Sequence, residues 1–180
     1  QIDSNKPYLP YDVSYGLVPP MKSFGEGYRF HVTGLNHNET GFPTMKPEIV
    51  AREEARLLQK ISANLEDIIK FDAFCMDDAE MVFVTFGATA RSVKVVVEEL
   101  RKTGKKAGMF RLITIWPFPE KQLLEYTKKA KIVFVVEMNL GQIVTEVERY
   151  IDRKMVKLIG KADGEPITPE YIFDALKQLD

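Results

Sequence analysis

Apolar and polar positions change their spacing along the chain in a way that predicts alternating strands and helices. Residues 81–86 form a continuous run of Met, Val, Phe and Thr, which is typical of a strand buried on both faces. Residues 89–103 instead place apolar side chains three or four positions apart, as in an amphipathic helix that ends near Gly104. The same two patterns recur to the end of the chain. They predict further strands over 107–115, 132–137 and 155–159, and further helices over 119–129, 142–151 and from Pro169 onward.

This order of elements predicts an α/β fold with a mostly parallel sheet and helices on both faces. Residues 77–180 carry enough apolar faces for a core of their own, so we expect them to fold without the preceding segment. Ligands and partners approach such a sheet at the carboxyl ends of its strands. The candidate functional residues are therefore those that follow each strand.

The preceding segment has a different composition. Residues 1–47 hold six of the ten prolines, together with several Gly and aromatic residues, which predicts an extended inter-domain arm with a short strand over 28–33. Aromatic residues are too frequent here for a disordered tail, so we expect the arm to pack against something. From Pro47 the apolar spacing is helical, and residues 48–76 are interpreted as a linking helix.

Composition and charge exclude several classes of protein. The 180 residues are 45% hydrophobic and 28% charged, as in ordinary folded proteins, and the formal charge of -1 gives no field that would attract nucleic acid. No stretch approaches the ~18 apolar residues of a membrane span and no secretory signal is evident, so we predict a cytoplasmic protein without membrane contact. The chain begins with Gln1, as expected for a fragment of something longer or for a processed or trimmed chain.

Few residues of the chain have the chemistry of a metal or nucleophile site. The single Cys75 rules out an internal disulfide, a structural cysteine zinc site and a cysteine-ligated iron–sulfur cluster within this chain alone. Both histidines, His31 and His37, lie in the arm, where a polar loop is favoured over a metal site. The region from residue 77 has no G-x-S-x-G elbow and no His, so an independent hydrolase is disfavoured.

The residues after the first strand of the α/β region are Gly87, Ala88 and Thr89. Gly allows a tight turn, and Thr89 can cap a helix whose N-terminus attracts anions. The segment lacks the further glycines of a dinucleotide fingerprint and the Lys of a phosphate loop. A plain tight turn is therefore favoured over a phosphate site.

Two further clusters follow the next strands. Trp116 and Pro117 place an aromatic beside stiff prolines, which suits a surface covered by another subunit, although burial within the same domain fits equally well. Glu137, Asn139 and Gln142 place a carboxylate and two amides after the third strand. Without a second catalytic partner, a structural hydrogen-bonding role for Glu137 is favoured over that of a general base.

Four long runs of the sequence resemble one known family. They are GYRFHVTGLNHNETGFPT, VTFGATARSVKVVVEELRKTGKKAGMFRLITIWPFPEK, VVEMNLGQIVTEVER and GEPITPEYI. In this order they are similar to the C-terminal region of the alpha subunit of 2-oxoacid:ferredoxin oxidoreductases, including the arm that follows that subunit's first domain. The resemblance implies a transketolase C-terminal-like domain. It also implies an enzyme that uses thiamine diphosphate, coenzyme A and iron–sulfur clusters to convert a 2-oxoacid to an acyl-CoA while reducing ferredoxin.

The resemblance does not extend to the domain that helps to bind the aminopyrimidine of thiamine diphosphate. It therefore implies a part of the alpha subunit that has no catalytic residue of its own, binds no cofactor alone and serves subunit assembly. The implied partner is the thiamine-diphosphate-binding beta subunit, with ferredoxin contacted indirectly and a homodimer possible. The candidate interface or channel-rim residues are Gly87, Ala88, Thr89, Trp116, Pro117, Glu137, Asn139 and Gln142.

A free-standing α/β module that binds a small molecule is the alternative. It would need a well-formed pocket shared by Gly87, Trp116 and Asn139, whereas an assembly subunit should expose an apolar patch at that end of the sheet.

Overall fold

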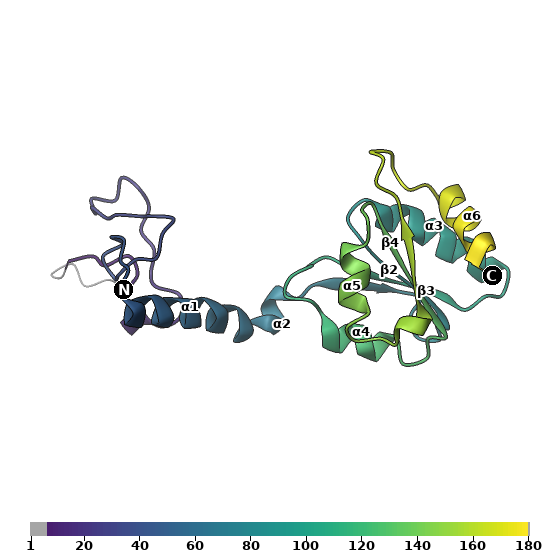
Figure 1. Cartoon of the computed structure of the whole chain (residues 1–180), viewed down its shortest axis with the longest axis horizontal. Helices are drawn as coiled ribbons and strands as arrows, with labels where there is room; N and C mark the ends of the chain where they lie inside the picture. Colours follow the sequence, from purple (N-terminus) through teal and green to yellow (C-terminus); the bar gives the residue numbers. More distant parts are fainter. Residues whose placement is uncertain (1–6, 180) are drawn as a thin grey trace. The chain divides into compact units, whose positions relative to one another are not determined.

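The computed structural model describes residues 7–179 and divides into two compact units, one ending at Leu65 and the other beginning at Glu66. The second unit contains a five-stranded sheet within its described residues, with the strand order β1-β3-β2-β4-β5 (Figure 1). Strands β2 to β5 are parallel, and β1 pairs with β3 in the antiparallel direction. The strands are β1 (Phe71–Phe74), β2 (Met81–Phe86), β3 (Ala107–Leu112), β4 (Ile132–Glu137) and β5 (Val156–Gly160).

Helices cover both faces of this sheet, which confirms the predicted fold class. Helices α3 (Thr89–Lys102) and α6 (Pro169–Leu179) contribute to one apolar core, and α4 (Glu120–Tyr126) and α5 (Gln142–Val147) contribute to the other. In Figure 1 the two pairs lie on opposite sides of the strands. Alternate residues of β2 enter the two cores, Val82 and Val84 on one face and Phe83 on the other. Because both faces of β2 are buried, its residues are apolar except Thr85, whose hydroxyl donates to the Val136 carbonyl at 2.9 Å.

Strand β1 lies inside the range predicted as a linking helix. That prediction is wrong beyond Ile68, because helix α1 (Pro47–Ser62) and the short α2 (Leu65–Ile68) are followed directly by β1. The four residues of β1 are too few to show a period in the sequence. Their conformation is set by pairing with β3, and the Phe71 ring stacks on Phe110 with 5.1 Å between ring centroids.

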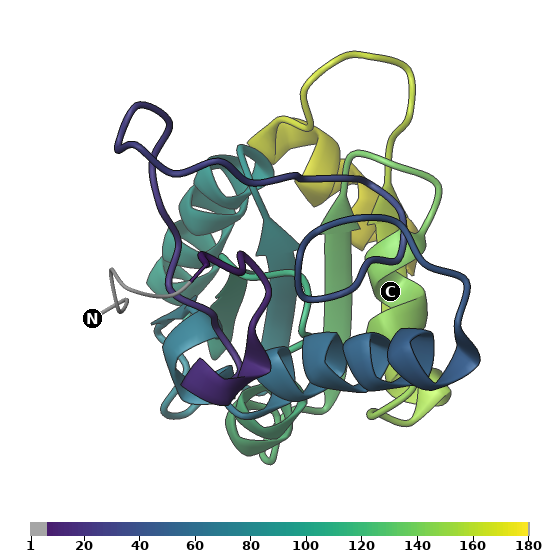
Figure 2. The same ribbon diagram turned by 90° about the vertical axis from the view of Figure 1, so that its left-hand side faces the viewer.

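The strand predicted over 28–33 is also absent. In the described part of the first unit, strand-type pairing is confined to one isolated bridge between His37 and Pro43, and Figure 2 shows the arm as irregular loops beside α1. A strand without a neighbouring strand leaves its backbone groups unpaired. The aromatic residues of this segment instead contact one another, as in the edge-to-face pair of Tyr8 and Phe30.

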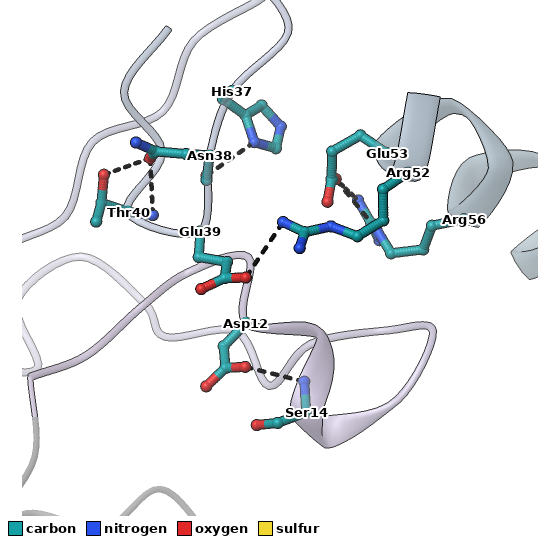
Figure 3. Close-up of polar contacts among 9 residues, drawn as sticks. All are labelled: Asp12, Ser14, His37, Asn38, Glu39, Thr40, Arg52, Glu53 and Arg56. Carbon is teal, nitrogen blue, oxygen red and sulfur yellow. Dashed lines mark hydrogen bonds and ion pairs between the residues drawn. The ribbon is translucent and has the colours of Figure 1, made fainter. Parts of the chain in front are cut away.

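Polar contacts hold the arm on α1 (Figure 3). The Arg56 guanidinium donates to the Glu53 carboxylate at 2.9 and 3.1 Å and to the Leu17 carbonyl at 3.0 Å, and Arg52 pairs with Glu39 at 3.2 Å. The described residues of the first unit that are buried are Pro10, Pro19, Gly41, Glu53 and Arg56. A few polar and aromatic contacts therefore take the place of an aliphatic core in this unit.

Candidate functional site

The parallel strands bring the predicted site residues to one edge of the sheet. Since β2 to β5 are parallel, the residues that follow them lie along the same side, which we call the carboxyl edge. It consists here of three turns, residues 87–89 after β2, 113–118 after β3 and 138–142 after β4. The chain also enters β1 at this edge, because Phe71 pairs with Leu112, the last residue of β3.

The turn after β3 is fixed at its base and exposed at its tip. The Thr114 hydroxyl donates to the Ile68 carbonyl at 2.6 Å and accepts from the Lys70 N–H at 3.0 Å. On either side of this anchor, Ile113 is 53% exposed and Trp116 is 68% exposed. Burial of Trp116 within its own domain, one of the two sequence interpretations, is therefore wrong. Pro117 follows it and is half-buried.

Glu137, the last residue of β4, is fully buried and serves as a helix cap. One of its carboxylate oxygens accepts from the Ile143 N–H at 2.8 Å, and the other accepts from the Val144 N–H at 2.9 Å. These bonds satisfy the first backbone donors of α5. Glu137 therefore has the structural hydrogen-bonding role favoured by the sequence, and its side chain does not form part of an exposed rim.

The rest of this turn combines backbone order with exposed apolar side chains. The Asn139 side-chain oxygen accepts from the N–H groups of Gly141 and Gln142 at 2.8 and 3.1 Å. Gly141 has a φ of 107°, and a Cβ there would meet Val144 at 3.1 Å, so a side chain would be strained at this position. Leu140 is 87% exposed. The turn therefore presents a fixed apolar side chain to the outside.

The turn after β2 has no comparable cap. Gly87 has a φ of 59°, Ala88 occupies the N-cap position without a side-chain hydrogen bond, and Thr89 is buried inside the first turn of α3. The prediction that Thr89 caps this helix is therefore wrong. Gly87 and Ala88 instead line a cavity of about 650 Å³ beside β1. Sequence reasoning missed this cavity because it did not detect β1.

The residues named for a small-molecule pocket do not come together in this cavity. Gly87 lines it, but Trp116 and Asn139 do not. What the turns after β3 and β4 share is a set of exposed apolar side chains, which we call the edge patch. Its members are Ile113, Ile115, Trp116, Met138 and Leu140. The arrangement favours contact with another protein surface.

Metal chemistry receives no support from the described residues, which contain no group of three or more His, Cys, Asp or Glu placed to hold an ion. His37 stacks on Tyr11 with 3.6 Å between ring centroids, and His31 stacks on Phe42 at 4.6 Å. Over residues 7–179, no helix has the length and apolar character needed to cross a membrane.

The fold and the carboxyl edge define an α/β domain with a mostly parallel sheet, and comparison with known proteins places it in a family. The family described as pyruvate:ferredoxin oxidoreductase core domain II matches residues 79–172. This chain belongs to that family, and the resemblance of its sequence to 2-oxoacid:ferredoxin oxidoreductase subunits is confirmed.

The sequence is also similar to curated relatives over nearly its whole length. It is 46% identical to the 2-oxoglutarate synthase subunit KorA of Methanocaldococcus jannaschii over 95% of this chain, and 36% identical to that of Methanothermobacter marburgensis over 94%. It spans 45% and 46% of those two proteins, so it covers about half the length of the relatives it matches.

Solved structures agree on the fold. The 2-oxoglutarate:ferredoxin oxidoreductase from Magnetococcus marinus, solved with 2-oxoglutarate, coenzyme A and succinyl-CoA, superposes with a TM-score of 0.81 at 24% identity, covering 98% of this chain and 31% of that chain. A split-gene transketolase superposes with a TM-score of 0.50 at 18% identity, covering 61% of this chain and 40% of that one. The transketolase-like architecture is therefore shared despite low sequence identity.

Proposed function

We propose that this chain is a non-catalytic part of the alpha subunit of a 2-oxoacid:ferredoxin oxidoreductase, and that the whole enzyme acts on 2-oxoglutarate. Relatives named 2-oxoglutarate synthase are 36–46% identical to the chain, whereas those named for ketoisovalerate or pyruvate are 26–28% identical. In the proposed reaction the 2-oxoacid loses carbon dioxide, its acyl group is transferred to coenzyme A, and ferredoxin accepts the two electrons released.

The proposed role of this chain is assembly, and the observation that carries it is the exposed Trp116 in the edge patch. Aromatic residues at the centre of an interface contribute strongly to binding when they are desolvated. The anchored turn at Thr114 and the capped turn at Glu137 hold their neighbours in place without a partner, so little order has to be gained on binding. The proposed partner is the thiamine-diphosphate-binding beta subunit or an adjoining domain of the alpha subunit.

The cofactors of the reaction are proposed to be held by other parts of the enzyme. A cysteine-ligated iron–sulfur cluster does not fit a chain whose only cysteine is Cys75. The buried strand-end carboxylate of Glu137 does not fit a role in binding thiamine diphosphate, because both of its oxygens already accept backbone hydrogen bonds. We therefore propose that the chain alone is inactive and that ferredoxin interacts with it only through the assembled, cytoplasmic enzyme.

Co-expression tests this proposal. The tagged chain is produced together with the beta subunit and the remaining domains of the alpha subunit, and the purified material is assayed for 2-oxoglutarate-dependent ferredoxin reduction. We expect a stable complex whose activity requires the chain. Recovery of the chain alone, or equal activity without it, would contradict the proposal. So would stoichiometric thiamine diphosphate or an iron–sulfur chromophore in the chain purified by itself.

A further inference from the structure

The cavity beside β1 is a trough with a basic lining. Its walls are residues 72–74 of β1, the Gly87–Ala88 turn and first two turns of α3, and Met109 and Arg111 of β3. We call this cavity of about 650 Å³ the basic trough. It belongs entirely to the second unit and shares no residue with the edge patch.

Three cations and one carboxylate line the basic trough. Arg91 and Lys94 are three residues apart on α3 and so share a helix face, and Arg111 projects from β3. The Arg111 Nη1 pairs with Asp72 at 3.1 Å, whereas the side chains of Arg91 and Lys94 form no ion pair or hydrogen bond with the described residues. The Lys94 Nζ lies over the Phe74 ring, 5.0 Å from its centroid. The lining therefore carries two positive charges that have no ion-pair partner among the described residues, in a chain whose formal net charge is -1.

The position of these charges is unfavourable for the helix itself. The N-terminus of α3 is positive because of the helix dipole, and cations are stabilising at the opposite end. Yet the first turn of α3 contains Arg91 and no acidic residue, and the N-cap Ala88 supplies no side-chain acceptor. Helix α5 differs, because the Glu137 carboxylate neutralises its start. Helix stability does not account for the charges around the start of α3.

Arg111 is not among the proposed donors to a ligand. Its Nη1 pairs with Asp72, and its Nε is buried without a hydrogen-bond partner among the described residues. An oxyanion in the trough would bring negative charge to Arg91, Lys94 and the positive start of α3 at once.

We propose that the basic trough binds the phosphoryl group of a small anionic ligand. The phosphate oxygens accept from the Arg91 and Lys94 side chains and from the first turn of α3. This site is separate from the assembly surface, so it stands whether or not the edge patch binds a partner.

Calorimetric titration of the whole chain with inorganic pyrophosphate tests the site. The variants are Arg91→Gln and Lys94→Gln, and the matched control is Lys121→Gln, which removes an exposed positive charge from α4 on the other face of the sheet. We expect saturable binding of one pyrophosphate, weakened about tenfold by each of the first two changes, equivalent to about 1.4 kcal/mol. The control should change the affinity less than about twofold. Absence of saturable binding, or equal loss in all three variants, would overturn the proposal.

Thermal melting gives a second readout. Pyrophosphate should raise the melting temperature of the unchanged chain by mass action and should have a much smaller effect on Arg91→Gln. Without pyrophosphate, Arg91→Gln should melt at the same or a higher temperature, since a cation has been removed from a positive helix end. A lower melting temperature of the free variant would show that Arg91 serves folding, and would refute the assignment to a ligand.

Discussion

Truncation of Trp116 separates assembly from folding. The side chain is 68% exposed, and an aromatic of this size buries roughly 200 Å² when covered, so a partner would remove about 140 Å² more from water. At about 25 cal/mol per Å² this burial is worth about 3.5 kcal/mol. We therefore expect Trp116→Ala to weaken binding of the partner by roughly 300-fold.

The same change should leave folding almost unaffected. Substitution of an exposed side chain usually changes the free energy of unfolding by no more than about 0.5 kcal/mol. In a chain of this size that corresponds to a change of about 1–2 °C in the melting temperature. Lys105→Ala is the control, because Lys105 is exposed and lies beyond the end of α3, near the amino end of β3. It should change neither the binding constant nor the melting temperature appreciably.

Two measurements on each variant decide the matter. Surface plasmon resonance against the immobilised partner gives the affinity, and calorimetric melting of the isolated chain gives the stability. Unchanged affinity with a melting temperature lowered by several degrees would place Trp116 in a folding role and refute the interface. Equal losses of affinity for Trp116→Ala and Lys105→Ala would show that the edge patch is not the binding surface.

Three further predictions concern stability. Glu137→Gln should lower the free energy of unfolding by about 1–3 kcal/mol, measured by urea titration, because an amide group would face a backbone N–H of α5. The control Glu98→Gln, at an exposed position of α3, should leave it nearly unchanged. A chain beginning at Glu66 should melt cooperatively. A chain beginning at Asp77 lacks β1 and should melt at a clearly lower temperature. Equal melting temperatures would show that β1 does not stabilise the domain. Side-chain hydrogen bonds from Lys131 and Lys106 lower the pKa of Glu80 below its ordinary 4.5. The ionised Glu80 carboxylate therefore adds to the free energy of unfolding above pH 4.5, the ordinary value, and this stabilisation is lost as the pH falls through the folded-state pKa. The urea midpoint of Glu80→Gln should accordingly fall less on acidification than that of the unchanged chain.

The α/β architecture could be predicted from the sequence because its strands are buried on both faces. A run such as Met81–Phe86 has no other stable environment than the centre of a sheet with helices on each side. Strand β1 lacked this signal, since residues 71–74 lie at the sheet edge and their exposure is intermediate or high. Its direction and pairing depend on contacts with β3, 35 or more residues away in the chain, which no local pattern contains.

The site was only partly predictable for a related reason. The parallel sheet could be expected to gather the turns after each strand, and the structure does bring Gly87, Trp116 and Asn139 to the carboxyl edge. Their exposure could not be read from residue type, because Trp116 suited an interior and a surface equally well. Exposure depends on which apolar side chains the core can accommodate. After β4, Ile143 and Val144 are buried in the core, whereas Leu140 is exposed.

The starts of α3 and α5 show how similar local sequences acquire opposite electrostatics. Each helix follows a buried strand and a glycine with positive φ, so the sequence suggests the same tight turn at both. At α5 the last residue of the strand is Glu137, which turns back and neutralises the helix start. At α3 the corresponding strand ends in Phe86, and the nearby charges are the cations Arg91 and Lys94 on the helix and the ion pair of Arg111 with Asp72 on the strands. The start of α5 is thus neutralised by a carboxylate of the same chain, whereas the start of α3 has no such carboxylate and can accept an anionic ligand.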